Sequence, residues 1–410
     1  MSLRRRLLLF ALCVILSFSI GGGALPELFP NSETLESSLV PDADRYRADF
    51  ADRFAYTRLD DRLKACYGSV YTALTDHFAE DEPITFKDEN GSPMLYNGIM
   101  VHLPFALKSK EEAKILYNAL CDDNPQLFYL GTIFSLEGYA DNIENHYTAI
   151  RFSYTMDSEQ RTAARAALEQ AISEYIAGIE TLTDEYEKEL TLHDRLLADC
   201  EYDDTVSTDE ASGRVSRYTA YGALVEHKAV CEGYSRGIQL LFQRAGMECT
   251  VVTGASRENG ESHMWNCVNV NGSFYHLDAT WDDSADYVRH NYFNMTTRQA
   301  EITHIIDDVQ KDIPLCTASL DDYFIRNGTD FQRFDREETA KILAQHIING
   351  EKIVQLRFAD TQVEAALVFF KNSVLTWQIV DGHLAEHGLS LGSYALQHEN
   401  NEGILTIIQK

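Results

Sequence analysis

Three residues between positions 218 and 283 combine side chains that can transfer an acyl group. Cys231 stands where a helix is predicted to begin, with the sequence CEGYSRGIQLLFQRAG. His263 lies in a predicted strand, and Asp278 lies in the strand predicted to follow it. The thiolate is the reactive form of cysteine, and a helix N-terminus or a neighbouring imidazolium lowers the pKa of a thiol. We therefore predict Cys231 as a nucleophile, His263 as its base and Asp278 as the acid that orients the imidazole.

A hairpin signal relates the histidine to the aspartate. The dipeptide Asn271–Gly272 is typical of a two-residue loop between antiparallel strands. Counting outward from that loop places His263 opposite Thr280, with Asp278 two residues earlier on the same face. The two side chains are then diagonal neighbours whose backbones lie roughly 7–8 Å apart, within reach of a hydrogen bond. A shift of one residue in the loop would send one of them to the opposite face.

Each of these residues alone has an ordinary structural interpretation. A cysteine is often a small core residue, a strand histidine often has a satisfied hydrogen bond, and an aspartate often caps a turn. Their order, spacing and predicted elements together favour a catalytic site. His193, on the apolar face of a predicted helix, is instead expected to be a core residue.

A serine in the same helix resembles a nucleophile of another enzyme class. Residues 233–237 read Gly-Tyr-Ser-Arg-Gly, which matches the G-x-S-x-G elbow of serine hydrolases. That elbow follows a core strand and has its triad in the order Ser, acid, His. Residues 228–230 make a poor core strand, and here the histidine precedes the aspartate. Ser235 also lies one turn inside the helix, so we do not expect it to be the nucleophile.

The overall composition describes an acidic globular protein. The chain has 410 residues, of which 45% are hydrophobic and 24% charged, and this length is enough for two or three domains. The formal net charge is -29 and the pI is about 4.7. Such a charge repels nucleic acid and anionic lipid, so neither is expected as a partner.

The first 24 residues are predicted to be an export signal. Three arginines at positions 4–6 precede an apolar run, Leu7–Ile20, and small residues follow at positions 21–24. The apolar run is short for a membrane span, which needs about 20 residues. We expect a cleaved signal and a secreted or cell-surface protein, with a retained anchor as the alternative.

The cysteines predict at least one free thiol. Eight are present, and seven remain if Cys13 leaves with the signal. An odd number outside the cytoplasm cannot pair completely, although the other six could form disulfides. No C-x-x-C pair occurs, so a structural zinc site has no support, and we expect neither a metal nor a cofactor.

Periodicity and capping signals predict mixed helices and strands along the whole chain. Before the site, helices are expected at 62–80, 109–119, 157–182 and 186–200, and strands at 99–103, 127–131 and 149–154. Around the site, we expect a short helix at 219–227, the Cys231 helix ending at Gly246, a strand at 251–252, a polar loop at 254–261, the hairpin, a strand at 291–295 and a helix at 298–302. Residues 331–410 are expected to form a small α/β module with helices capped by Asp335 and Thr361, a strand at 353–358 and a closing hairpin of 394–398 and 404–408.

Three segments of the sequence resemble the transglutaminase-like superfamily of exported bacterial proteins. They are AYGALVEHKAVCEGYSRGIQLLFQRAG, SHMWNCVNVNGSFYHLDATWDD and NYFNM, which occur in the order of the family. The resemblance covers roughly Glu185 to Thr303. It implies an α+β, papain-like core in which a helix bearing the cysteine packs on an antiparallel sheet bearing the histidine and the aspartate.

The resemblance also implies a division of the chain. Residues 1–24 would be the signal peptide, 25–182 an N-terminal α+β region, 183–315 the catalytic core and 331–410 an accessory C-terminal module. Cys231, His263 and Asp278 would be the triad, and Trp265 and Trp281 would line or support the site. Asp282, Asp283 and Asp286 are expected in a solvated turn, because no calcium-loop pattern is present.

The expected chemistry is acyl transfer through a thioester. Water as acceptor makes a peptidase or amidase, whereas an amine makes a crosslinking transglutaminase. We favour hydrolysis of peptide or isopeptide bonds in a protein or peptide substrate, cell-wall peptides included. The third alternative is an exported binding or assembly protein that keeps the fold without turnover. The amides of the first turn after Cys231 could stabilise an oxyanion, with Tyr218 or Tyr221 as a further donor.

Overall fold

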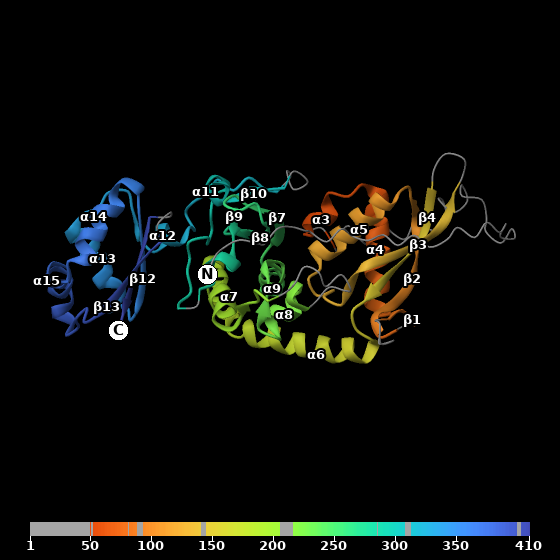
Figure 1. Ribbon diagram of the computed structural model, residues 1–410, viewed down its shortest axis with the longest axis horizontal. Helices are drawn as coiled ribbons and strands as arrows, with labels where there is room; N and C mark the ends of the chain where they lie inside the picture. Colours follow the sequence, from red (N-terminus) through yellow and green to blue (C-terminus); the bar gives the residue numbers. More distant parts are fainter. Residues whose placement is uncertain are drawn as a thin grey trace. The chain divides into compact units, whose positions relative to one another are not determined.

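A computed structural model describes residues 50, 52–80, 82–87, 93–140, 145–205, 216–284, 286–307, 313–399 and 403–410, so the predicted signal at 1–24 lies outside it. The fold is α+β, as predicted. The chain divides into two compact units (Figure 1). The first comprises the chain up to Val268 together with His304–Ile313, and the second comprises Asn269–Thr303 and Pro314–Lys410. Among the helices in the described residues, none is long and apolar enough to cross a membrane. The domain boundaries inferred from the sequence stay a prediction.

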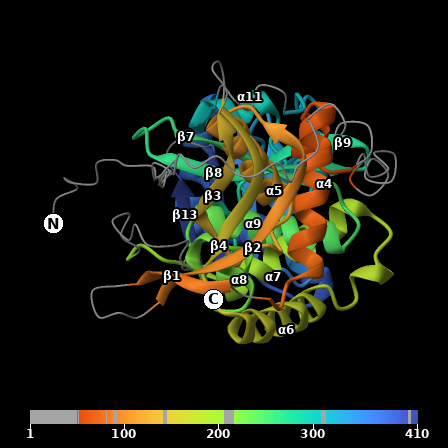
Figure 2. The ribbon, with the colours of Figure 1, turned by 90° about the vertical axis from the view of Figure 1, so that its right-hand side faces the viewer.

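The N-terminal part of unit 1 is an antiparallel sheet with helices against it. The strands are β1 (Glu82–Lys87), β2 (Pro93–Leu107), β3 (Leu130–Ala140) and β4 (Asn145–Tyr154), in the order β1-β2-β4-β3. The helices are α3 (Phe54–Thr57), α4 (Asp61–Asp76) and α5 (Lys110–Asp123), and Figure 2 shows α4 running beside β2. The helix predicted to begin at Ser109 is confirmed, and the Ser109 hydroxyl caps α5 by accepting the amide of Glu112 at 3.1 Å.

The strand predicted at 127–131 is mostly wrong, because β3 begins only at Leu130. The amide of Leu127 donates to the Asn124 carbonyl at 2.9 Å, and the amide of Leu130 donates to the Leu127 carbonyl at 3.1 Å. These bonds close two turns, so the apolar residues before Leu130 are buried without joining the ladder.

Two helices lead toward the central part of unit 1. Helix α6 (Ser158–Tyr175) begins with a complete capping box, in which the Asp157 side chain and the Gln160 side chain each accept the other residue's amide. It ends at Tyr175, seven residues earlier than predicted, because Gly178 has a left-handed φ of 82° and starts a short 3-10 helix, η1 (Ile179–Thr181). Helix α7 (Glu185–Asp199) follows, and His193 is fully buried on it, as predicted.

The central part of unit 1 surrounds helix α9 (Cys231–Arg244). Figure 1 shows α7 and α8 (Ala220–Leu224) beside it. Strand β7 (Cys249–Ser256) pairs antiparallel with β8 (Ser262–Val270) on one side and with β10 (His304–Ile306) on the other. Short elements complete the region: η2 (Ser216–Tyr218), and β5 (Glu201–Tyr202) paired in parallel with β6 (Lys228–Ala229). The predicted polar loop is shorter than expected, because Gly254 and the next two residues remain in β7. Gly254 and Ala255 pair with both neighbouring strands, and Ser256 pairs with β10.

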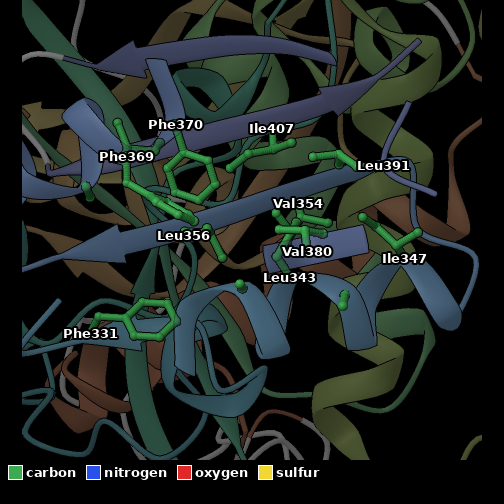
Figure 3. Packing of buried hydrophobic residues seen from close by; sticks show 14 of the residues in the cluster. Phe331, Leu343, Ile347, Val354, Leu356, Phe369, Phe370, Val380, Leu391 and Ile407 are labelled. Carbon is green, nitrogen blue, oxygen red and sulfur yellow. The ribbon is translucent and has the colours of Figure 1, made fainter. Parts of the chain in front are cut away.

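Unit 2 contains β9 (Ser273–Leu277), three short helices and a four-stranded sheet. The helices are α10 (Ala279–Asp282), α11 (Thr297–Thr303) and α12 (Tyr323–Arg326). The sheet has the order β11 (Asp330–Phe331), β12 (Ile353–Phe358), β14 (Ile404–Gln409), β13 (Tyr394–Glu399), with helices α13 (Arg336–Ile348), α14 (Asp360–Lys371) and α15 (Ser373–Leu384), which ends in η4 (Ala385–His387). Apolar side chains from this sheet and these helices form one core, including Leu343, Leu356 and Val380 (Figure 3).

Two predicted features of unit 2 are wrong. Residues 291–295 form no strand, because they turn back and make a single bridge between Met295 and His276. Helix α14 begins at Asp360 and its N-cap position is Ala359, so Thr361 lies inside the helix and does not cap it. The Asp335 cap of α13 is confirmed, since its carboxylate accepts the amides of Glu337 and Glu338 at 3.0 Å.

The predicted hairpin turn is confirmed by its backbone. Asn271 has a φ of 52° and Gly272 a φ of 81°, the two left-handed residues that a type I′ turn requires. Strand β8 ends at Val270 and β9 begins at Ser273, so the loop contains two residues, as expected. A side chain at Gly272 would meet nothing within 4 Å, so glycine is needed here only for its backbone freedom.

The turn gives a prediction that separates backbone strain from packing. Gly272→Ala should lower the free energy of unfolding by about 1 kcal/mol, because alanine disfavours a positive φ. Gly382→Ala is the matched control, since Gly382 is an interior residue of α15 that also has nothing within 4 Å. There alanine should raise stability by about 0.5–1 kcal/mol, because it favours the helix. Urea unfolding measures both changes, and the same sign for both would contradict the assigned turn.

Candidate active site

Cys231 is the first residue of a helix that is otherwise almost completely enclosed. Ten consecutive residues of α9, Gly233–Phe242, are buried, whereas Cys231 is partly exposed. The residue before it, Val230, has a side chain that cannot accept hydrogen bonds. The first amides of a helix have no partner within the helix. In α9 these are the amides that follow Val230. A thiol is thus placed at the accessible end of a rigid helix.

The backbone of η2 packs closely against this helix start. The Arg217 carbonyl accepts the amide of Val230 at 3.0 Å. A Cβ atom at Gly233 would lie 2.3 Å from that carbonyl oxygen, so only glycine fits. The Arg217 guanidinium pairs with Asp203 at 3.0 Å and with Glu226, which hold this segment in place. Gly233 therefore makes room for the protein's own backbone.

Ser235 joins the helix to the strand that carries the histidine. Its hydroxyl lies 2.8 Å from the Cys231 carbonyl and 2.9 Å from the Met264 carbonyl, so it can donate to either. The side-chain amide of Asn266 donates to the Ser235 carbonyl at 3.0 Å. Ser235 is buried, with 2% of its surface exposed. These bonds fix the first turn of α9 against β8 beside His263, and they give the serine a structural role.

His263 lies in a cluster of three buried rings. It is 6% exposed, and its ring stacks on that of Trp265 with the centroids 6.0 Å apart. The ring of His304, from β10, lies 4.5 Å from Trp265 and 5.7 Å from His263. Trp265 is fully buried and supports the histidine as a core residue. These contacts restrict the orientation of the His263 imidazole.

His304 is a residue of this cluster that the sequence reasoning missed. It is followed by two isoleucines, and the apolar run could have indicated a short strand, although three residues give a weak signal. Gly254 is what allows this strand to approach. A Cβ atom at Gly254 would lie 2.0 Å from the Ile305 carbonyl oxygen and 2.8 Å from the Trp265 ring.

Asp278 begins helix α10 in unit 2. Strand β9 ends at Leu277, so the expectation that Asp278 and Thr280 both lie in the strand is wrong. The Asp278 Oδ1 atom accepts the amides of Thr280 and Trp281, at 3.0 and 3.2 Å. Its own amide donates to the Tyr292 carbonyl at 3.1 Å, and its side chain is fully buried. The carboxylate is thus an N-cap whose orientation is fixed by backbone donors.

The predicted acidic turn after Asp278 is wrong at its first residue. Asp282 is fully buried, and its Oδ1 atom accepts the amide of Tyr292 at 2.9 Å. The Trp281 ring packs against the Tyr292 ring in an edge-to-face arrangement, with the centroids 5.2 Å apart. Asp282 therefore belongs to the structural support of α10 and not to a solvated loop.

The structure places Cys231 and His263 in unit 1, linked through Ser235, and Asp278 in unit 2. Their assignment as a catalytic triad stays a prediction. Tyr221, one expected oxyanion donor, stacks its ring on Phe128 with the centroids 5.2 Å apart, and Tyr218 ends η2. The oxyanion roles of both tyrosines also stay predictions.

Cysteine burial separates Cys231 from the other described cysteines. Cys66, Cys121, Cys200, Cys249, Cys267 and Cys316 are all buried, and among the described residues no disulfide is present. Burial raises the pKa of the Cys66 thiol to about 11 and that of Cys249 well above its usual range. The thiols of Cys66 and Cys249 are therefore buried, and they are predominantly protonated at neutral pH.

We expect iodoacetamide to modify Cys231 before any other cysteine of the folded protein. The reagent needs access and a thiolate, and the six other described cysteines are buried. Mass spectrometry of peptides after brief labelling measures the order of modification. Urea-unfolded protein is the control, in which all cysteines should react at similar rates. Equal labelling of the folded protein at Cys231 and Cys66 would contradict the expectation.

A variant of Ser235 tests its structural role. Ser235→Ala should lower the free energy of unfolding by about 1–3 kcal/mol, because the buried Met264 carbonyl loses the hydroxyl donor. Ser390→Ala changes an exposed serine and should stay within about 0.5 kcal/mol. Urea unfolding measures both, and Cys231 labelling should persist in each variant. An unchanged stability for Ser235→Ala would show that the serine hydroxyl does not support the helix.

Comparison with known proteins identifies the class of domain. Residues 170–279 match the model of the transglutaminase-like superfamily, so the chain carries a transglutaminase-like domain. This superfamily includes both cysteine peptidases and transglutaminases. A comparison with curated proteins found no match.

Two solved structures illustrate the likeness. One is described as a TGase, with 16% sequence identity, coverage of 52% of this chain and 58% of that one, and a TM-score of 0.26. The other is the periplasmic domain of TgpA from Pseudomonas aeruginosa, with 15% identity, coverage of 33% and 57%, and a TM-score of 0.22. The chain spans less than two thirds of the length of both structures. Both TM-scores are low, so the assignment of the transglutaminase-like domain rests on the match to the family model.

Proposed function

We propose that this protein is an exported transglutaminase-like cysteine enzyme that hydrolyses peptide or isopeptide bonds through a thioester at Cys231. One observation carries the proposal. Within the region that matches the family, Cys231 is partly exposed at the start of a buried helix, whereas the other described cysteines are buried. The basic and apolar residues at positions 1–24 support export, and a protein or peptide, cell-wall peptides included, is the proposed substrate.

The proposed reaction has two acyl-transfer steps. His263 takes the proton of the Cys231 thiol, and Sγ attacks the carbonyl carbon of the scissile bond. The tetrahedral intermediate collapses when its C–N bond breaks, and the imidazolium returns the proton to the leaving amine. Water, deprotonated by His263, then attacks the thioester and releases the carboxylic acid and the thiol. The amides of the first turn of α9 are the proposed donors to the oxyanion in both steps.

Asp278 is the proposed orienter of His263. Both amide donors of α10 bond the Oδ1 atom of its carboxylate. In the proposal, Oδ2 accepts the N–H of the imidazole, which fixes one tautomer and stabilises the imidazolium. In this arrangement one oxygen of the carboxylate anchors the side chain, and the other orients the proposed base.

The decisive assay separates the possible acceptors. Purified protein is incubated with a casein-type substrate in the presence and in the absence of a labelled primary amine. Cleavage without incorporation is expected if water resolves the thioester. Incorporation of the amine would overturn hydrolysis in favour of crosslinking. Neither product would favour a binding protein that keeps the fold without turnover.

Cys231→Ala should abolish the activity entirely, because the other cysteines in the described part of the chain are buried. Cys66→Ala is the matched control, since the Cys66 thiol is buried with a raised pKa, and it should retain activity. Ser235→Ala should also retain it. Residual turnover in Cys231→Ala, or its loss only in Ser235→Ala, would contradict the proposed nucleophile.

A further inference from the structure

A buried glutamine of the C-terminal sheet is bonded to the segment that follows Asp278. Gln355 lies in the middle of β12 and is 3% exposed. Its Oε1 atom accepts the amide of His290 at 3.1 Å, and its Nε2 atom donates to the Val288 carbonyl at 2.9 Å. The same Nε2 atom lies 3.2 Å from His290 Nδ1. A single side chain of the sheet thus fixes two residues of this segment through both ends of its amide.

The neighbouring strand makes a second attachment. The Tyr287 hydroxyl and the Thr406 hydroxyl, from β14, are 3.1 Å apart, and both residues are buried. The His290 ring also stacks on Tyr323 with the ring centroids 4.0 Å apart and the planes nearly parallel. Residues 287–290 are therefore held by the sheet through several separate contacts.

The same segment is bonded to helix α10 on its other side. The Tyr292 carbonyl accepts the amide of Asp278, and the Tyr292 amide donates to the Asp282 carboxylate. The Arg289 amide donates to the Asp282 carbonyl at 3.0 Å. The backbone of 287–292 thus connects the C-terminal sheet to both ends of the helix that Asp278 begins.

This connection is specific because buried polar groups are destabilising when they lack hydrogen-bond partners. The backbone groups that a buried amide side chain without partners leaves unbonded add to that cost. Gln355 avoids the cost through its bonds to residues 288 and 290, so the sheet and the segment adopt mutually defined positions.

We propose that Gln355 is a positioning residue, through which the C-terminal sheet fixes the location of Asp278. The module is then part of the acyl-transfer machinery and not an independent accessory domain. This inference rests on the proposed function of Asp278 as the acid that orients the catalytic histidine.

The test compares Gln355→Leu with Thr376→Val. Leucine is similar in size to glutamine but makes no hydrogen bonds. Thr376 is fully buried in the same module, and its hydroxyl bonds the carbonyls of Phe369 and Asn372, so it controls for loss of module stability. The amides of Thr280 and Trp281 donate to the Asp278 carboxylate, so their rate of hydrogen exchange measures directly whether this cap is intact. We expect it to accelerate roughly tenfold or more in Gln355→Leu and to stay unchanged in Thr376→Val.

Activity provides a second readout. Because Gln355 is proposed to position a residue of the chemical step, Gln355→Leu should lower kcat roughly ten- to a hundredfold while KM changes less than about twofold. Thr376→Val should leave both constants near the wild-type values. If Gln355→Leu fails to fold, Tyr287→Phe removes only the hydroxyl that bonds Thr406, and it should show the same pattern to a smaller degree.

Unchanged exchange at Thr280 and Trp281 in the Gln355 or Tyr287 variant would overturn the inference. Equal acceleration in Thr376→Val would also overturn it, because the effect would then reflect general loosening of the module. Exchange is measured on the protein whether or not it turns over a substrate. An inactive wild-type protein therefore contradicts the proposed function, whereas an unaltered exchange pattern contradicts the role of Gln355.

Discussion

The structure of unit 1 depends on the burial of a helix that is not purely apolar. Ten consecutive residues of α9 are buried, and they include Ser235, Arg236 and Gln239. A buried polar side chain is tolerated only when it is hydrogen-bonded. Each of these three therefore bonds a carbonyl of a neighbouring element: Ser235 that of Met264 in β8, Arg236 that of Cys121 and Gln239 that of Asp122, both in α5. The helix can occupy only the position in which all these partners are met.

This constraint explains why the cysteine needs no mobile element to place it. Ser235, Arg236 and Gln239 bond the helix to β8 and α5, and the Arg217 carbonyl packs closely against Gly233 near its start. Cys231 is therefore rigidly fixed at the point where the buried helix reaches the surface. In the proposed function, this fixed position would keep the approach geometry of the Cys231 thiol the same from one turnover to the next. The hydrogen bonds that allow the polar side chains of α9 to be buried also fix the position of its first residue.

Features encoded by local sequence could be predicted, and features set by distant partners could not. The helix start at Asp157, the Asn271–Gly272 turn and the start of α9 each depend on a few adjacent residues, and the sequence predicts each of them. The burial of Asp282 depends on the Tyr292 amide, ten residues later. The place of His304 beside His263 depends on β10 joining β7. No local pattern carries that information, so the sequence predicts a solvated turn at Asp282 and gives no signal that places His304 beside His263.

The end of strand β9 shows how one residue can serve structure and chemistry together. The sequence placed Asp278 in the strand, whereas the structure places it one residue beyond, where its carboxylate caps α10. An N-cap fixes the side-chain torsions of an aspartate, because Oδ1 must reach two amides of the first turn. A fully buried carboxylate held in this way loses little further entropy when it orients an imidazole. Capping thus gives the proposed orienting acid its rigidity, and any contact that moves α10 moves the acid with it. The position of this acid then depends on the bonds of Tyr292. Through residues 287–290, it also depends on a sheet that begins more than fifty residues later in the chain.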